Sequence, residues 1–110
     1  MTRNDIHNYS FRYKVDNKTA EEELLRRHKD TRCARKLLQE AIYGLFELNG
    51  LQRNVFYKYL TVRGIYKDSN QARMQLAHNG AGSKQLLEER IVQRYKDIYF
   101  AFQDFKKGLK

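Results

Sequence analysis

The chain has 110 residues, of which 41% are hydrophobic and 32% are charged, and 22 Lys and Arg against 13 Asp and Glu give it a net charge of +9. This length suits one domain with a single modest core, and the apolar content argues against a fully disordered chain. A positive field of this strength attracts polyanions, among which nucleic acid is the commonest, and also membrane surfaces and acidic proteins. The alternative is that the charge serves only to keep the protein in solution.

Cysteine usage and the pattern of apolar residues bear on the compartment. Cys33 is the only cysteine, so no internal disulfide can form and nothing requires an oxidising environment. The first ten residues hold no apolar run typical of a signal peptide, and no stretch approaches the roughly 20 apolar residues of a membrane span. We therefore expect a soluble protein of the cytoplasm that has no membrane partner.

Residues 1–18 are predicted to form an extended N-terminal arm. Tyr9, Phe11, Tyr13 and Val15 alternate with polar residues, which is the period of a half-buried strand. A lone strand leaves its backbone hydrogen bonds unsatisfied. Pairing with a second copy of the chain or with residues 55–62 is therefore an alternative to an arm packed by its aromatic side chains.

A helix is predicted to begin near Thr19, which forms the outline of a capping box with Glu22. One long helix over residues 20–48 fits the pattern that follows. The alternative is a kink in its polar middle turn, with Asp30 or Thr31 capping a second helix.

The strongest helical pattern defines the main core helix. Its apolar residues recur at steps of three and four: Ala34, Leu37, Leu38, Ala41, Ile42, Leu45, Phe46 and Leu48. The pair Asn49-Gly50 suits the left-handed conformation that commonly ends a helix. We therefore place the end of this helix at that pair.

Two shorter helices are predicted next, giving the outline of a helix-turn-helix over residues 51–79. Leu51, Val55, Tyr59 and Val62 recur at helical spacing, although residues 55–62 also fit a strand. After a connector, Ser69 is the predicted cap of a helix that runs to about His78. Its first residues include types that read base edges, namely Asn70, Gln71 and Arg73. An ordinary helical hairpin with a polar start is the alternative.

The final helix is predicted over residues 84–107, capped by Ser83. Its apolar side is wider than a minimal bundle needs, and we expect it to serve the core or a homodimer. The chain contains no proline and no internal repeat that would mark a domain boundary. The predicted fold is therefore all-α, a small bundle of about four helices that forms one domain over residues 19–110.

No constellation typical of an enzyme is found in the sequence. His28 and Cys33 come nearest to a metal-binding pair, but no second pair has usable spacing. Residues 80–84, Gly-Ala-Gly-Ser-Lys, lack the order and the preceding strand of a Walker loop, so a glycine loop before a helix is the better interpretation. We predict no catalytic residues, no metal and no cofactor.

The basic stretch at residues 26–36 carries the functional prediction. Its six cations are the predicted phosphate contacts: Arg26, Arg27, Lys29, Arg32, Arg35 and Lys36. Arginine predominates among them, and a guanidinium can hold a phosphate with two parallel hydrogen bonds. A solvated helix surface and a docking site for an acidic protein are the alternatives.

The predicted function is non-enzymatic nucleic-acid binding, with DNA preferred over RNA. Small size with a basic, tyrosine-rich composition is typical of a regulator or accessory factor from a phage or plasmid. The alternative is a protein-interaction module that binds and inhibits or adapts a larger host enzyme.

Overall fold

The computed structural model describes residues 3–78 and 86–109, and every regular element in this part of the chain is an α-helix. The helices are α1 (Arg3–Tyr13), α2 (Asn17–Phe46), α3 (Gly50–Val62), α4 (Ser69–His78) and α5 (Glu89–Lys107). The predicted all-α class is therefore confirmed, with five helices in place of about four. The glycine loop at residues 80–84 and the predicted cap Ser83 lie outside the described residues. Within the described ranges no helix is both long and apolar enough to cross a membrane.

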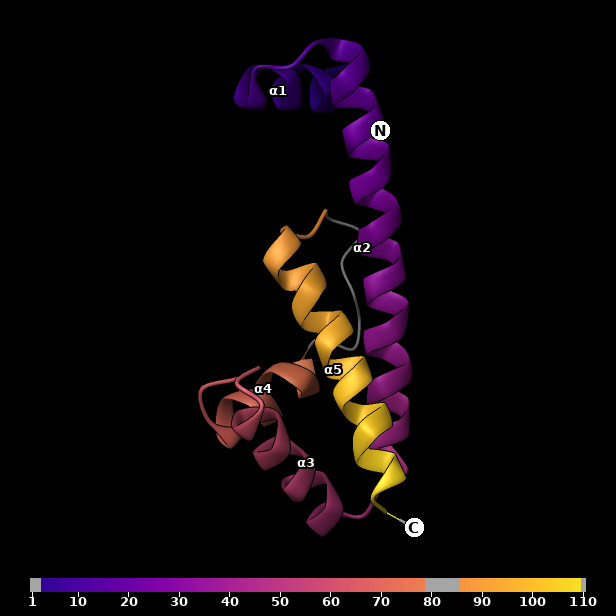
Figure 1. Cartoon of the computed structure of the whole chain (residues 1–110), viewed down its shortest axis with the longest axis vertical. Helices are drawn as coiled ribbons and strands as arrows, with labels where there is room; N and C mark the ends of the chain where they lie inside the picture. The colour runs from indigo at the N-terminus through magenta and orange to yellow at the C-terminus, as the bar shows by residue number, and fades with distance from the viewer. Residues whose placement is uncertain (1–2, 79–85, 110) are drawn as a thin grey trace.

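The 30-residue helix α2 is the spine of the molecule. Figure 1 shows α5 beside the C-terminal half of α2 and running in the same direction, while α3 and α4, which lie between them in the sequence, are placed to the left of both. At the other end α1 folds back across α2. The molecule is elongated, at 51 × 23 × 22 Å, and its radius of gyration of 16.7 Å exceeds the roughly 13 Å of a compact domain of this length. The N-terminal part of α2 thus projects beyond the main core.

The core is formed by buried residues of the C-terminal half of α2, of α3 and α4, and of α5. Its largest fully buried side chains are Phe56, Phe102, Leu45, Leu60 and Ile98. The rings of Phe56 and Phe102 meet edge to face with their centroids 5.3 Å apart, an arrangement that aromatic pairs prefer. This contact joins α3 to α5, and α5 in turn packs along α2.

The extended arm predicted for residues 1–18 is wrong, because Arg3–Tyr13 form the helix α1. The described residues offer no strand to pair with, whereas a helix satisfies its backbone hydrogen bonds internally. Tyr9 and Tyr13 lie one turn apart, with ring centroids 4.5 Å apart. Phe11 is left exposed, so the alternation of aromatic residues does not reflect burial. The helix ends at Tyr13, and the next residue, Lys14, has a φ of 56°, in the left-handed region where glycine is usual after a helix.

Helix α2 starts earlier than predicted and has no break. Its N-cap is Asp16, whose carboxylate accepts the Thr19 N–H at 2.6 Å, so Thr19 lies inside the helix. Hydrogen bonds from Thr19 lower the pKa of Asp16 below its ordinary value. The helix continues through Asp30 and Thr31, which confirms the single long helix over the kinked alternative.

The caps of α3 and α4 also differ from the predicted ones. Asn49, predicted with the following glycine to end the preceding helix, starts α3 instead. Its side chain accepts the Gln52 N–H at 2.8 Å, and the Gln52 side chain accepts the Asn49 N–H in return. Asp68, rather than Ser69, caps α4, because its carboxylate accepts the Gln71 N–H at 2.7 Å.

The hairpin of α3 and α4 contains the two helices predicted for residues 51–79, and the strand alternative for residues 55–62 is wrong. Residues 63–68 connect the helices, a longer link than the roughly three- or four-residue turn usual in a helix-turn-helix. The DNA-binding motif itself therefore stays a prediction.

Helix α5 begins at Glu89, later than the predicted start at residue 84; residues 84 and 85 lie outside the described part of the chain. Its buried residues are Val92, Ile98, Ala101 and Phe102, and among the large apolar side chains of α5 only Phe100 is exposed. The wide apolar side that suggested a homodimer is thus largely used inside the molecule. Dimerisation through residues 84–107 stays a prediction.

Candidate nucleic-acid interface

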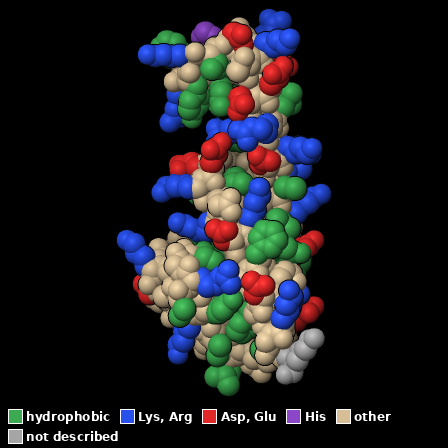
Figure 2. All heavy atoms as spheres, in the orientation of Figure 1, with side chains coloured by type: hydrophobic (Ala, Val, Ile, Leu, Met, Phe, Trp, Pro, Cys, Tyr) green, Lys and Arg blue, Asp and Glu red, His purple; other side chains and the backbone are tan. Residues whose placement is uncertain are grey.

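Positive charge is spread over the molecule rather than gathered on one end. On the face shown in Figure 2, Lys and Arg side chains occur along the whole length, with Asp and Glu among them. Local pairing therefore decides which cations of the basic stretch of α2 are available to a polyanion.

The basic stretch is divided between two sides of α2. The side that packs on the rest of the molecule is marked by buried or half-buried residues at alternating steps of four and three: Ala20, Leu24, Arg27, Thr31, Ala34, Leu38, Ala41 and Leu45. This spacing keeps one side of a helix against its neighbours. Arg27 and Thr31 belong to this series, so part of the basic stretch lies on the packed side of α2.

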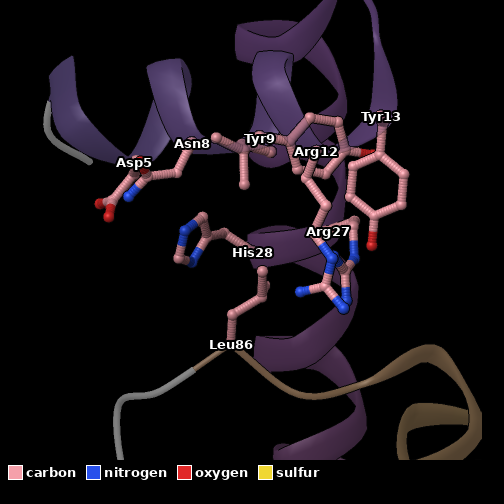
Figure 3. A pocket seen from close by; sticks show the side chains of 9 residues that line it. Asp5, Asn8, Tyr9, Arg12, Tyr13, Arg27, His28 and Leu86 are labelled. Carbon is pink, nitrogen blue, oxygen red and sulfur yellow. The ribbon is translucent and has the colours of Figure 1, made fainter.

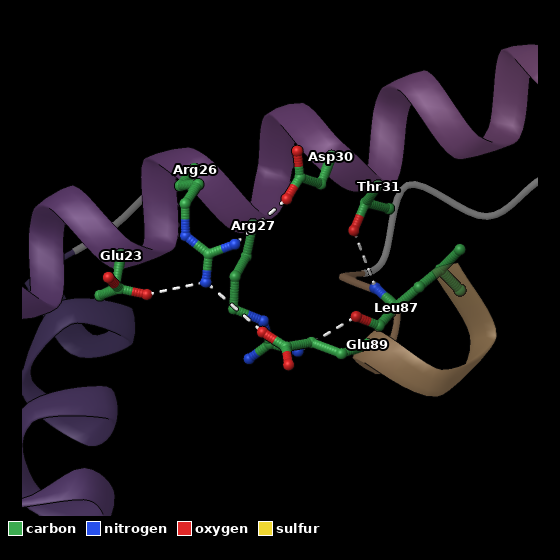
Figure 4. A network of polar contacts seen from close by, with 7 residues as sticks. All are labelled: Glu23, Arg26, Arg27, Asp30, Thr31, Leu87 and Glu89. Atoms are coloured by element: carbon green, nitrogen blue, oxygen red, sulfur yellow. Dashed lines mark hydrogen bonds and ion pairs between the residues drawn. The ribbon is translucent and has the colours of Figure 1, made fainter. Parts of the chain in front are cut away.

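Arg27 and Thr31 hold the segment before α5 against α2. The Arg27 guanidinium donates to the Leu87 carbonyl at 3.1 Å, and the Leu87 N–H donates to the Thr31 hydroxyl at 3.3 Å (Figure 4). Thr31 is only 2% exposed, and an unpaired polar group in such a position would be costly. Arg27, a predicted phosphate contact, therefore has a structural role of its own.

Arg26 is surrounded by carboxylates. Its guanidinium lies 2.8 Å from Glu23, 3.2 Å from Asp30 and 3.4 Å from Glu89, as Figure 4 shows. The hydrogen bond and charge of Glu23, followed by the bond to Glu89, raise the pKa of Arg26 above its ordinary value. A phosphate would have to compete with these carboxylates, so Arg26 is a poor candidate for contact with nucleic acid.

Lys29, Arg32 and Lys36 form what we call the basic face of α2. All three are exposed, and none forms an ion pair or hydrogen bond with another described residue. They lie within about 10 Å along the helix axis and on one side of it. Arg35 is half-buried on a neighbouring side and is already engaged in an interaction. The six predicted contacts thus reduce to three whose charge is fully available.

Exposed residues that were not predicted from the sequence extend the basic face in both directions. Lys18, Leu25 and Tyr43 lie on the same side of α2 and are exposed. Gln39 donates to the Tyr43 hydroxyl at 2.9 Å. Tyr43 lies about 10 Å beyond Lys36 along the helix axis, so an exposed aromatic ring extends the side that carries the cations. The steps of seven from Lys18 to Leu25 and from Lys36 to Tyr43 are the signal that could have identified them.

An open pocket of about 420 Å³ lies between α1 and the projecting part of α2. Figure 3 shows Arg27 and His28 of α2 across from Tyr9 and Arg12 of α1, with Leu86 below them. Aromatic and cationic side chains therefore border the same space, with Asp5 at its rim. The pocket could not be anticipated from the sequence, because it depends on α1 being a helix.

The predicted base readers occupy a different part of the molecule. Helix α4 packs mainly on α3, so the fold does not join these residues to the basic face. Arg73 donates to the Asn70 side-chain oxygen at 2.9 Å, and both residues are exposed. The Gln71 side-chain oxygen accepts the Lys67 N–H at 3.2 Å and is part of the helix cap. The structure therefore brings Asn70 and Arg73 together and assigns Gln71 a local task.

No family model, curated protein or solved structure matches this chain. Among the described residues, no group of three or more His, Cys, Asp and Glu could hold a metal ion. Functional inference therefore depends on the geometry of the basic face and of the pockets.

Proposed function

We propose that this protein binds nucleic acid without catalysing a reaction, and that the basic face of α2 contacts the phosphates. One observation carries the proposal: Lys29, Arg32 and Lys36 share one side of an unbroken helix, are exposed and have no partner among the described residues. On a chain of net charge +9, such cations release the counterions of a polyanion when they bind it, which is a large favourable term.

Phosphate contacts position a protein on nucleic acid but do not read sequence. We therefore assign any base reading to α4, where Asn70 and Arg73 lie near the start of the second helix of the hairpin. A helix used in this way enters the wide major groove of B-form DNA, whereas the major groove of RNA duplexes is too narrow for it. Duplex DNA is for this reason the preferred target, and regulation or packaging the role that follows.

A mobility-shift titration with two charge-matched variants tests the proposal. The triple variant Lys29→Glu, Arg32→Glu, Lys36→Glu removes the basic face, while Arg3→Glu, Lys67→Glu, Lys107→Glu makes the same change in net charge at exposed residues elsewhere. At about 50 mM salt we expect the first variant to bind duplex DNA at least about tenfold more weakly and the second to lose much less. Thermal melting checks that both remain folded.

Two outcomes would contradict the proposal. The first is wild-type protein that binds neither duplex nor single-stranded DNA or RNA at low salt. The second is an equal loss of affinity in both triple variants, since that result would assign binding to net charge alone and not to the basic face.

The second candidate is a protein-interaction module, and the exposed side of α3 favours it. Leu51, Val55 and Val62 lie along that side and are exposed, with Lys58 between them. Exposed apolar stripes of this kind mark contact surfaces. The matching partner is a larger protein with an apolar groove and an acidic rim. Its binding would be lost in Leu51→Ser, Val62→Ser and retained in the variant that lacks the basic face.

A further inference from the structure

A second pocket, of about 240 Å³, lies between α3 and the start of α4. Six side chains line it: Asn54, Tyr57 and Lys58 from α3, and Ser69, Asn70 and Arg73 from α4. Each of the six can donate a hydrogen bond, and two of them are cations. No carboxylate is among them, so the lining is suited to an anion and poorly suited to a cation.

Tyr57 provides a polar atom that the fold leaves unused. The residue is only 8% exposed and belongs to the core, yet its hydroxyl forms no hydrogen bond with any described residue. The hydroxyl has no hydrogen-bond partner among the described residues but is not fully enclosed, so it is part of the small accessible surface of Tyr57. Tyr57 borders the pocket. Burial raises the pKa of Tyr57, while the nearby guanidinium groups of Arg53 and Arg73 oppose this rise. A neutral hydroxyl beside a guanidinium is a donor ready for an anion.

The start of α4 adds to the positive electrostatic potential of the pocket. The first N–H groups of a helix have no partner inside it, and the helix dipole places partial positive charge there. Asp68 takes up the Gln71 N–H and does not line the pocket. The bond from Arg73 to the Asn70 oxygen fixes the guanidinium at the pocket and leaves the Asn70 amide nitrogen as a donor.

We propose that this pocket binds a phosphate group, with Lys58 and Arg73 supplying the charge and Tyr57 a hydrogen bond from the buried side. The non-bridging oxygens of a phosphate ester accept several hydrogen bonds and pair with both the ammonium and the guanidinium group of the lining. The group can belong to the backbone of a nucleic acid or to a phosphorylated small molecule. The inference goes beyond the proposed function, because it does not depend on the basic face of α2 and gives Asn70 and Arg73 a phosphate-binding role in place of base reading.

Backbone and side-chain amide shifts of the full chain, followed by NMR during titration with inorganic phosphate, test the site. Ionic strength is held constant with chloride. We expect saturable shifts at Ser69, Asn70 and the Asn54 side chain, with a dissociation constant on the order of 1 mM. Arg73→Met and Lys58→Met should abolish saturation, and Tyr57→Phe should weaken binding severalfold without unfolding the core. Lys67→Met, an exposed change outside the lining, should leave binding as in wild type.

Two further titrations distinguish the sources of the phosphate. A dinucleotide phosphodiester that shifts the same amides identifies a nucleic-acid backbone, and a response limited to ribose 5-phosphate identifies a phosphorylated small molecule; both support the site. The site is overturned if shifts stay linear, spread equally over all exposed cations, or persist in Arg73→Met. The variant without the basic face should respond to phosphate as wild type does, so that failure of one proposal can be told from failure of the other.

Discussion

Gly44 and Phe102 approach so closely that a Cβ atom on Gly44 would lie 2.5 Å from Cε1 and 2.9 Å from Cζ of the phenylalanine ring. Phe102 is fully buried and also contacts Phe56, so its ring cannot easily turn away. Glycine inside a helix costs about 1 kcal/mol relative to alanine, and here the close approach of α5 explains its presence. The absence of a side chain at this position sets the spacing of the parallel pair α2 and α5.

The first prediction concerns this contact. Gly44→Ala should lower the free energy of unfolding by about 1–3 kcal/mol, because the cost of overpacking exceeds the gain in helix propensity. Gly50→Ala is the matched control, since nothing lies within 4 Å of a Cβ atom placed there. Urea denaturation of both variants gives the comparison. If Gly44→Ala were as stable as the control, the close packing of α2 on α5 would be wrong.

The second prediction concerns the bond between Thr31 and Leu87. Thr31→Val keeps the shape of the side chain but removes the acceptor of the Leu87 N–H, so we expect a loss of about 1 kcal/mol in unfolding free energy. Hydrogen exchange of the Leu87 amide should be faster in Thr31→Val than in the wild-type protein. Thr61→Val is the control, because the Thr61 hydroxyl bonds only to the Tyr57 carbonyl of its own helix. Equal effects in both variants would show that Thr31 does not hold the two segments together.

The third prediction concerns Tyr66, which is 5% exposed and whose hydroxyl is enclosed without a hydrogen-bond partner among the described residues. Tyr66→Phe removes this unpaired group and should raise the free energy of unfolding by about 1 kcal/mol at neutral pH. Tyr43→Phe, a change at an exposed ring, should have little effect on stability. A destabilised Tyr66→Phe variant would mean that the hydroxyl has a partner after all.

The fourth prediction follows from the titration of the same residue. Burial raises the pKa of Tyr66 to about 12, against about 10 for an unfolded tyrosine. The folded state therefore holds this proton more tightly, and the resulting stability is complete below about pH 10 and is lost as the pH rises towards 12. Denaturation at pH 8 and pH 11 should show a smaller alkaline loss in Tyr66→Phe than in wild type. Identical losses in the two proteins would contradict the burial of this hydroxyl.

The fifth prediction separates paired from unpaired cations within the basic stretch. Arg26→Ala should leave the affinity for duplex DNA nearly unchanged, because three carboxylates surround that guanidinium. Arg32→Ala removes one phosphate contact and should flatten the dependence of log K on log salt by about 0.9, from a slope of about −2.7 for three contacts. Binding measured at several salt concentrations gives both slopes. The basic face would be the wrong surface if Arg26→Ala had the larger effect.

The sequence by itself determined the helices with strong internal periodicity and the positive net charge of the chain. Apolar residues at steps of three and four define a helix wherever the rest of the chain lies, so α2, α3 and the hairpin with α4 could be placed from local pattern. Net charge is likewise a sum over residues. The structure of the N-terminal segment could not be predicted in this way. Its aromatic residues fit the period of a strand, but no partner strand is present among the described residues, and the segment forms a helix.

Only the tertiary structure decided which cations of the basic stretch contact distant segments, whereas Arg26 also pairs with Glu23 and Asp30 of its own helix. Arg26 and Arg27 look like their neighbours in the sequence. Arg26 contacts Glu89 and Arg27 contacts Leu87, which lie 63 and 60 positions further along the chain. The phosphate pocket likewise needs Tyr57 and Arg73 to meet across the hairpin. Hydrogen bonds and ion pairs act over a few ångströms, so their partners depend on how distant segments pack, and local periodicity carries no information about that.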